Sequence, residues 1–142
     1  MLRHVMGDTK FFPALKNYVK TFAYKNASTE DFQRVCEREY GSALDWYFKE
    51  WVYGTGRPRY KTIWTNTRNE NGSVVKLTIA QTQPEPIFFR MPLDVELITS
   101  SASKAFVVWN NQKTQEIEFR VEGNVTQVKI DPSGWVLKTV IP

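Results

Sequence analysis

The sequence changes character at residues 54–58, which read Gly54-Thr55-Gly56-Arg57-Pro58. Before this stretch, apolar residues recur at steps of three and four, the period of an amphipathic helix. After it, apolar and polar residues alternate, as they do in half-buried strands of antiparallel sheets. We therefore predict an α+β protein with a helical segment over residues 1–56 and an antiparallel β-sandwich of about seven strands over residues 57–142.

Glycines and capping patterns delimit the predicted helices. Gly7 is predicted to close a first helix as a left-handed cap, and Asp8 to cap the start of a second. The capping-box pattern, a hydroxyl residue followed three positions later by an acid, occurs at 28–31 and again at 42–45. It predicts a third helix that carries Phe32, Val35 and Cys36 on one face, and a fourth helix over residues 42–53.

Seven alternating runs predict the strands of the sandwich. Turn signals separate them, among them Asn71-Gly72, Pro84-Glu85-Pro86 and Pro132-Ser133-Gly134. The runs fall at residues 59–65, 75–79, 95–97, 106–108, 117–121, 128–130 and 135–140.

Composition excludes several classes of protein. The chain has 142 residues, 42% of them hydrophobic, and no apolar run near the roughly 20 residues that a membrane-spanning helix needs. The net charge of +4 is spread along the chain, and the short cluster Arg57, Arg59 and Lys61 is typical of a solvated strand face. We therefore predict neither a membrane span nor a nucleic-acid partner, because the latter would need clustered cations.

The residues that could carry chemistry do not form a catalytic constellation. His4 is the only histidine and Cys36 the only cysteine, whereas a zinc site needs three or four ligands. Cys36 lies on an apolar helix face, which predicts a buried, unreactive thiol. The acids at 30–31 and at 37 and 39 point to different sides of their helix, and the hydroxyls at 100–103 lack a histidine partner. We predict no catalytic, cofactor-binding or metal-binding residue in this sequence.

Aromatic residues are crowded into the helical part. Twelve of the 20 lie in the first 56 positions. A few short helices bury only a modest fraction of their surface. Leaving three such rings in water forfeits roughly 5–9 kcal/mol, which is comparable to the whole stability of a small domain. The rings must therefore face either the sandwich, in a self-contained helix-plus-sheet fold, or protein that this chain lacks. We expect the second, with the segment as the tail of a larger helical domain and self-association through its exposed face when that neighbour is missing.

Five stretches of the helical part resemble the late helices of the gluzincin aminopeptidases, the zinc-dependent family that includes aminopeptidase N. The resemblance is specific across about residues 1–64 and includes Gly56 and Pro58. It rests on residues 1–12 (MLRHVMGDTKFF), 14–18 (ALKNY), 28–32 (STEDF), 41–48 (GSALDWYF) and 51–53 (WVY).

The resemblance implies that residues 1–56 close a thermolysin-like catalytic domain and that a β-sandwich domain follows over 57–142. Family members remove N-terminal residues from peptides with one zinc, held by an H-E-x-x-H helix and a further glutamate. Those motifs do not occur here, so no functional residue is transferred to this sequence. The implied cofactor is zinc in the parent enzyme and none in this segment. The implied partners are the rest of the parent catalytic domain and, for the parent, peptide substrates.

Two other interpretations stay open at this point. The sandwich could be a stand-alone module that binds a protein or carbohydrate through Trp64, Trp109 or Trp135. The chain could also come from a relative that has lost its zinc ligands. The subcellular compartment is not specified, since a single cysteine suits reducing and oxidising surroundings alike.

Overall fold

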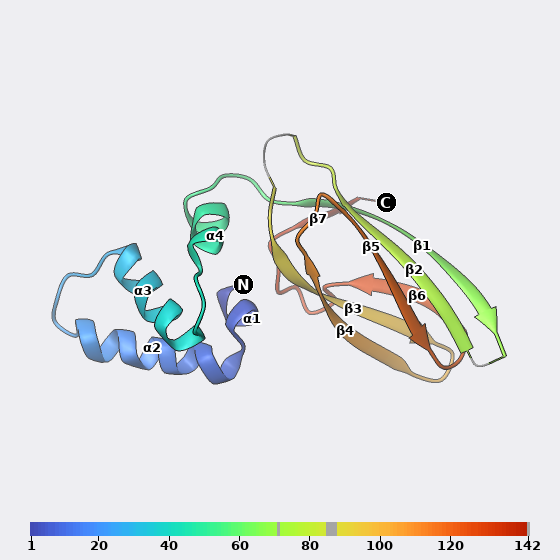
Figure 1. Ribbon diagram of the computed structural model, residues 1–142, viewed down its shortest axis with the longest axis horizontal. Helices are drawn as coiled ribbons and strands as arrows, with labels where there is room; N and C mark the ends of the chain where they lie inside the picture. The colour runs from blue at the N-terminus through green and yellow to red at the C-terminus, as the bar shows by residue number, and fades with distance from the viewer. Residues whose placement is uncertain (71, 85–87, 142) are drawn as a thin grey trace. The chain divides into compact units, whose positions relative to one another are not determined.

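The computed structural model describes residues 1–70, 72–84 and 88–141 (Figure 1). The chain forms two compact units, Met1–Thr55 and Gly56–Pro142. The first is helical and the second consists of strands, which confirms the predicted fold class. The predicted turns at 71–72 and 84–86 lie partly outside the described residues.

The helical unit contains four α-helices and a short π-helix. The longest helix, α2, continues through Pro13 without a break. The elements are α1 (Leu2–Met6), α2 (Asp8–Phe22), α3 (Thr29–Tyr40), α4 (Asp45–Tyr47) and the π-helix η1 (Phe48–Val52).

The capping predictions for these helices have mixed outcomes. The box at the start of α3 is confirmed, since the Ser28 hydroxyl accepts from the Asp31 amide and the Asp31 carboxylate accepts from the Ser28 amide. The box predicted at 42–45 is wrong, because α4 begins after Leu44 with no side-chain cap. The Leu44 amide instead donates to a carboxylate oxygen of Glu37, 2.8 Å away.

The predicted junction at Gly7 and Asp8 also differs in detail. Gly7 has φ 71° and ψ 158°, a positive-φ conformation that is not the left-handed helical cap. Asp8 does not cap α2 but is its first residue, and its carboxylate receives two hydrogen bonds from the Arg3 guanidinium at 2.7 and 2.9 Å. The Asp8 side chain, which was predicted to cap α2, therefore forms the ion pair with Arg3.

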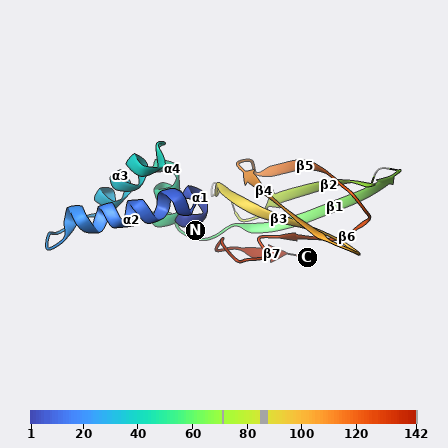
Figure 2. The ribbon, with the colours of Figure 1, turned by 90° about the horizontal axis from the view of Figure 1, so that it is seen from below.

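Two sheets form the sandwich unit (Figures 1 and 2). The four-stranded sheet has the order β5-β2-β1-β7 and the three-stranded sheet the order β4-β3-β6. The strands are β1 (Arg59–Asn69), β2 (Gly72–Gln81), β3 (Met91–Thr99), β4 (Ser103–Asn110), β5 (Thr114–Val121), β6 (Val125–Ile130) and β7 (Thr139–Ile141).

Alternation along the central strands builds the core of this unit. On β2, every second residue from Val75 to Ile79 is fully buried, and on β3 the same holds from Met91 to Leu97. A two-residue period directs one face of each strand to the interior. The buried residues of the two central strands are Val75, Leu77, Ile79, Met91, Leu93, Val95 and Leu97.

The last strand is shorter than predicted, and it is parallel rather than antiparallel to its neighbour. β7 covers Thr139–Ile141 rather than 135–140, and it pairs with β1 in parallel. The Asp131 carboxylate accounts for the late start, because it accepts hydrogen bonds from the amides of Trp135 and Val136. Amides that are bound to a side chain are not available to a strand ladder.

Candidate functional site

The candidate metal ligand His4 and the candidate nucleophile Cys36 both lie on helices of the first unit. His4 is half-buried on α1. Cys36 is completely buried on α3, and burial, followed by the charge of Glu37, raises the pKa of its thiol to about 11. A thiol with a raised pKa is a poor nucleophile and a poor metal ligand.

Cys36 is therefore expected to resist thiol reagents in the folded protein. At pH 8 the shift of its pKa lowers the thiolate fraction on the order of a hundredfold. Labelling with a disulfide reagent should be slower than in urea by at least this factor, since burial also blocks access. A Ser42→Cys variant, at an exposed position, is the control. Equal labelling rates at the two cysteines would contradict the expectation.

The same burial gives the helical unit a sensitivity to alkali. The folded state holds the Cys36 thiol neutral. Below the ordinary thiol pKa of 9.0 the unfolded chain is neutral at this residue too, so the stability of the folded unit is fully present there. As the pH rises from 9.0 towards about 11, only the unfolded chain ionises, and the stability of the unit falls. Burial likewise raises the pKa of Tyr47 to about 12, which extends the loss to higher pH.

The candidate acids of α3 hold the helical unit together. The Glu39 carboxylate accepts from the Asn17 amide nitrogen at 2.7 Å and joins α3 to α2. Glu30 accepts a hydrogen bond from the Tyr53 hydroxyl at 2.7 Å, and this bond lowers the pKa of Glu30. Glu37 binds the Leu44 amide, as described above. Each acid thus has a local structural contact, and the geometry does not pair two of them as acid and base.

The other polar candidates lie near structural contacts or are exposed. Thr99, at the end of β3, accepts from the Ala102 amide at 3.0 Å and donates to the Ala102 carbonyl at 2.9 Å, which fixes the turn that contains residues 100–102. Arg57 donates to the Thr139 hydroxyl at 2.9 Å. Arg59 and Lys61 are exposed on β1, as the alternating spacing predicted.

Within the described residues, no three His, Cys, Asp or Glu side chains come together as a group that could hold a metal ion. No helix in this part of the chain is long and apolar enough to cross a membrane.

A buried amide cluster was missed by the sequence analysis. The Gln81 amide nitrogen donates to the Phe89 carbonyl at 2.6 Å and to the Asn110 side-chain oxygen at 2.7 Å. The Gln81 oxygen accepts from the Phe89 amide and from the Gln83 side chain. Polar residues at strand ends resemble ordinary turn residues in a sequence, so no local signal marks this cluster.

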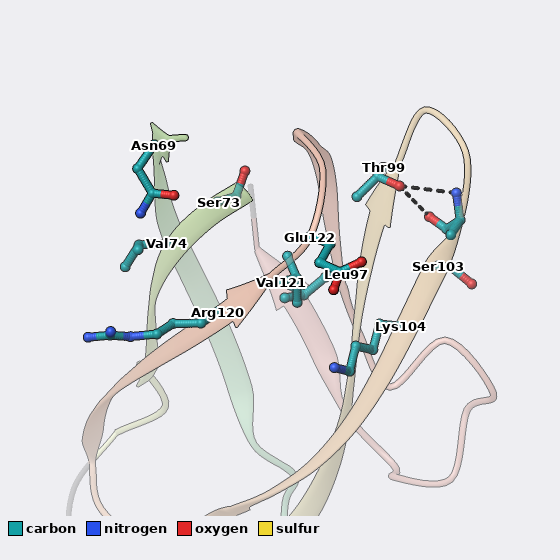
Figure 3. A pocket seen from close by; sticks show the side chains of 11 residues that line it. Asn69, Ser73, Val74, Leu97, Thr99, Ser103, Lys104, Arg120, Val121 and Glu122 are labelled. Carbon is teal, nitrogen blue, oxygen red and sulfur yellow. Dashed lines mark hydrogen bonds between the residues drawn. The ribbon is translucent and has the colours of Figure 1, made fainter. Parts of the chain in front are cut away.

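The sandwich has an open cavity of about 650 Å³ at the end where β2 begins and β3 and β5 end (Figure 3). Its lining includes Asn69, Leu97, Thr99, Lys104 and Glu122. Ser73 also lines it, but its hydroxyl donates to the Gly123 carbonyl and accepts from the Val125 amide. Figure 3 shows the Arg120 side chain extending away from Lys104, so the two cations do not converge on one point.

Apolar side chains of the helical unit are open to solvent. Tyr47 and Phe48 are the two buried rings among the twelve. Five large apolar residues are exposed, and we call them the helical apolar surface: Phe12 (49%), Val19 (65%), Tyr24 (108%), Val52 (46%) and Tyr53 (56%).

Most of the helical unit matches a known protein family. Residues 1–51 match the Peptidase family M1 domain. Aminopeptidase M1-B of Oryza sativa subsp. japonica is 38% identical over 58 residues, which cover 41% of this chain and 7% of that protein. Transcription initiation factor TFIID subunit 2 of Saccharomyces cerevisiae is 36% identical over 77 residues, which cover 47% of this chain and 5% of that protein.

The fold of the whole chain also has a match among solved structures. Aminopeptidase A of Legionella pneumophila, in complex with aspartic acid, is similar over 99% of this chain with a TM-score of 0.74. At 20% identity this is a likeness of fold. The chain spans 16% of that structure and an even smaller share of the two sequence relatives.

Proposed function

We propose that the chain is a structural part of a larger zinc aminopeptidase. This proposal is supported by the match of residues 1–51 to the Peptidase family M1 domain. In this proposal, residues 1–56 complete the helical catalytic domain and residues 57–142 form the sandwich domain that follows it. The parent would hydrolyse N-terminal residues from peptides, while this part would brace the catalytic domain.

The helical apolar surface is the observation that carries this proposal. Val19 and Phe12 project from α2, while Val52 and Tyr53 lie at and just after the end of η1, and all of them are exposed. Fully burying one such side chain is worth about 1.5–3 kcal/mol. A neighbouring helical body that covered several of them would stabilise the unit by an amount similar to the stability of a small domain.

The relatives support a structural rather than a chemical role for this segment. Parts of this chain match a protein named an aminopeptidase and one named a transcription initiation factor subunit. Similarity to proteins with such different names is better explained by folding and packing than by one reaction.

Within the described residues, the side chains that could bind zinc have other structural contacts. Burial, followed by the charge of Glu37, raises the pKa of Cys36, and the acids of α3 already accept hydrogen bonds from Asn17, Leu44 and Tyr53. Zinc in the parent would polarise the peptide carbonyl and acidify a water molecule. We propose that its ligands lie in the rest of that enzyme.

The purified chain is therefore expected to hold no stoichiometric zinc and to leave aminoacyl-nitroanilides uncleaved. The chain would be incubated with zinc, dialysed, and assayed for bound metal and for release of nitroaniline. An intact M1 aminopeptidase treated in the same way is the positive control. One tightly held zinc per chain, or turnover that a chelator abolishes, would overturn the proposal.

The reading frame upstream of Met1 separates this proposal from a stand-alone module. An H-E-x-x-H motif in a continuous upstream frame supports the proposal. A stop codon and a ribosome-binding signal just before Met1 contradict it and favour the module. An upstream M1 domain with substituted ligands would indicate a non-catalytic relative in which this part keeps the same structural role.

A further inference from the structure

Strand β4 forms one edge of the three-stranded sheet. Among the described residues it pairs with β3 alone, with Leu93 opposite Val108 and Val95 opposite Phe106. Its other side therefore presents backbone donors and acceptors in an extended row. Such a row is a template for a further strand.

The side chains of β4 do little to prevent strand addition. Residues 105–109 are five consecutive apolar residues, and Lys104 is the one charged residue of the strand. Val107 is 64% exposed and Trp109 43% exposed. Edge strands of soluble proteins are usually protected by charges, prolines or short length.

The other outer strands of the two sheets have such protection. β5 carries Glu116, Glu118 and Arg120 on alternate positions. β6 is shorter than β4 and exposes Thr126, Gln127 and Lys129, and β7 has three residues. In the described part of the chain, β1 is also unpaired on one side beyond Lys61, but residues 62–69 include two apolar residues. β4 is therefore the open edge with the longest apolar run.

We propose that a second copy of this chain pairs with β4 in antiparallel fashion, about a two-fold axis through Val107. The two three-stranded sheets would then form one continuous six-stranded sheet. A two-fold axis perpendicular to a sheet keeps each side chain on the same face of the sheet in both copies. Odd-numbered residues therefore pair with odd-numbered residues, and even-numbered with even-numbered. Centred on Val107, this register pairs Phe106 with Val108 and Ala105 with Trp109.

Size complementarity and the separation of the two lysines favour this register and this occupant. The small Ala105 lies opposite the large Trp109, and Lys104 lies opposite the polar Asn110. The two Lys104 residues are six positions apart along the paired strands, about 20 Å, which exceeds the screening length at physiological salt. A register centred on Phe106 would instead place Lys104 opposite the apolar Val108. The strand is thus complementary to itself.

Sedimentation of the intact chain from micromolar to near-millimolar concentration tests the proposal. The wild-type chain is expected to shift from monomer to dimer. Val107→Lys places two cations opposite each other and is expected to weaken dimerisation at least about tenfold. Ile63→Lys is the matched control, because Ile63 is 60% exposed on β1 of the other sheet. The Ile63 variant should dimerise like wild type, and near-ultraviolet circular dichroism would verify that both variants are folded.

A charge-exchange experiment tests the two-fold axis itself. Val107→Glu and Val107→Lys are each expected to be mainly monomeric, whereas their equimolar mixture should dimerise because opposite charges then meet. A monomeric wild-type chain at every concentration would overturn the proposal, and so would a mixture that stays monomeric. Val19→Lys tests the helical apolar surface in the same assay. If this variant, and not Val107→Lys, removes the dimer, the copies associate through that surface and the β4 proposal is wrong.

Discussion

Replacing Asp131 with alanine is expected to lower the unfolding free energy of the sandwich unit by about 3–5 kcal/mol. The Asp131 side chain is completely buried and accepts hydrogen bonds from the amides of Trp135 and Val136 at 2.8 and 3.0 Å. It also forms an ion pair with Lys138, whose side chain is only 13% exposed. Its loss would leave two amides and a nearly buried ammonium group without this partner.

Urea titration of the intact chain, followed through amide resonances of β1–β3, measures this effect in the sandwich alone. The control is Glu118→Ala, which removes an exposed pair with Arg120 and should cost at most about 1 kcal/mol. Combining Asp131→Ala with Lys138→Met should recover part of the loss, because the unpaired charge is removed as well. A loss below that of the control would show that the Asp131 contacts do not hold the loop before β7.

Replacing Gln81 with leucine is expected to cost the sandwich unit about 2–4 kcal/mol, although leucine is apolar and similar in size. Gln81 is 2% exposed, and its side chain binds both backbone groups of Phe89 and the side chains of Gln83 and Asn110. Without it, several buried polar groups lose a hydrogen-bond partner. An unsatisfied buried polar group costs more than the net contribution of the bond that it made.

Gln127→Leu is the matched control, because Gln127 is exposed on β6 and its substitution should change stability by less than about 0.5 kcal/mol. The double variant of Gln81→Leu with Asn110→Leu should lose less than the sum of the two single variants, since both partners of one bond are then apolar. Full additivity, or a Gln81→Leu variant as stable as the control, would contradict the assigned network.

Local patterns predicted the elements whose causes lie within a few residues. The capping box at Ser28 formed because its partner, Asp31, is three positions away. The burial of Cys36 followed from helical spacing, and the buried residues of β2 and β3 followed from strand alternation. In each case the backbone period alone decides which side of the element a residue faces.

The predictions that failed involve side chains with a competing partner elsewhere. Asp8 binds Arg3 of the preceding helix instead of capping its own, and the Leu44 amide binds Glu37 instead of a cap at Ser42. The helix predicted over 42–53 is shorter and passes into a π-helix at Phe48. Gly54 lies just after this π-helix. A Cβ atom on residue 54 would lie 2.4 Å from the Glu50 carbonyl oxygen.

The sequence by itself determined the division into a helical and a strand-forming part, the relationship of residues 1–51 to the M1 peptidases, and the excess of aromatic residues at the start of the chain. The tertiary structure decided which polar residues are buried and paired, such as Gln81 with Asn110, 29 positions apart. It also decided which strands form the sheet edges. Periodicity records only contacts that repeat along one element, whereas these features arise where distant elements meet.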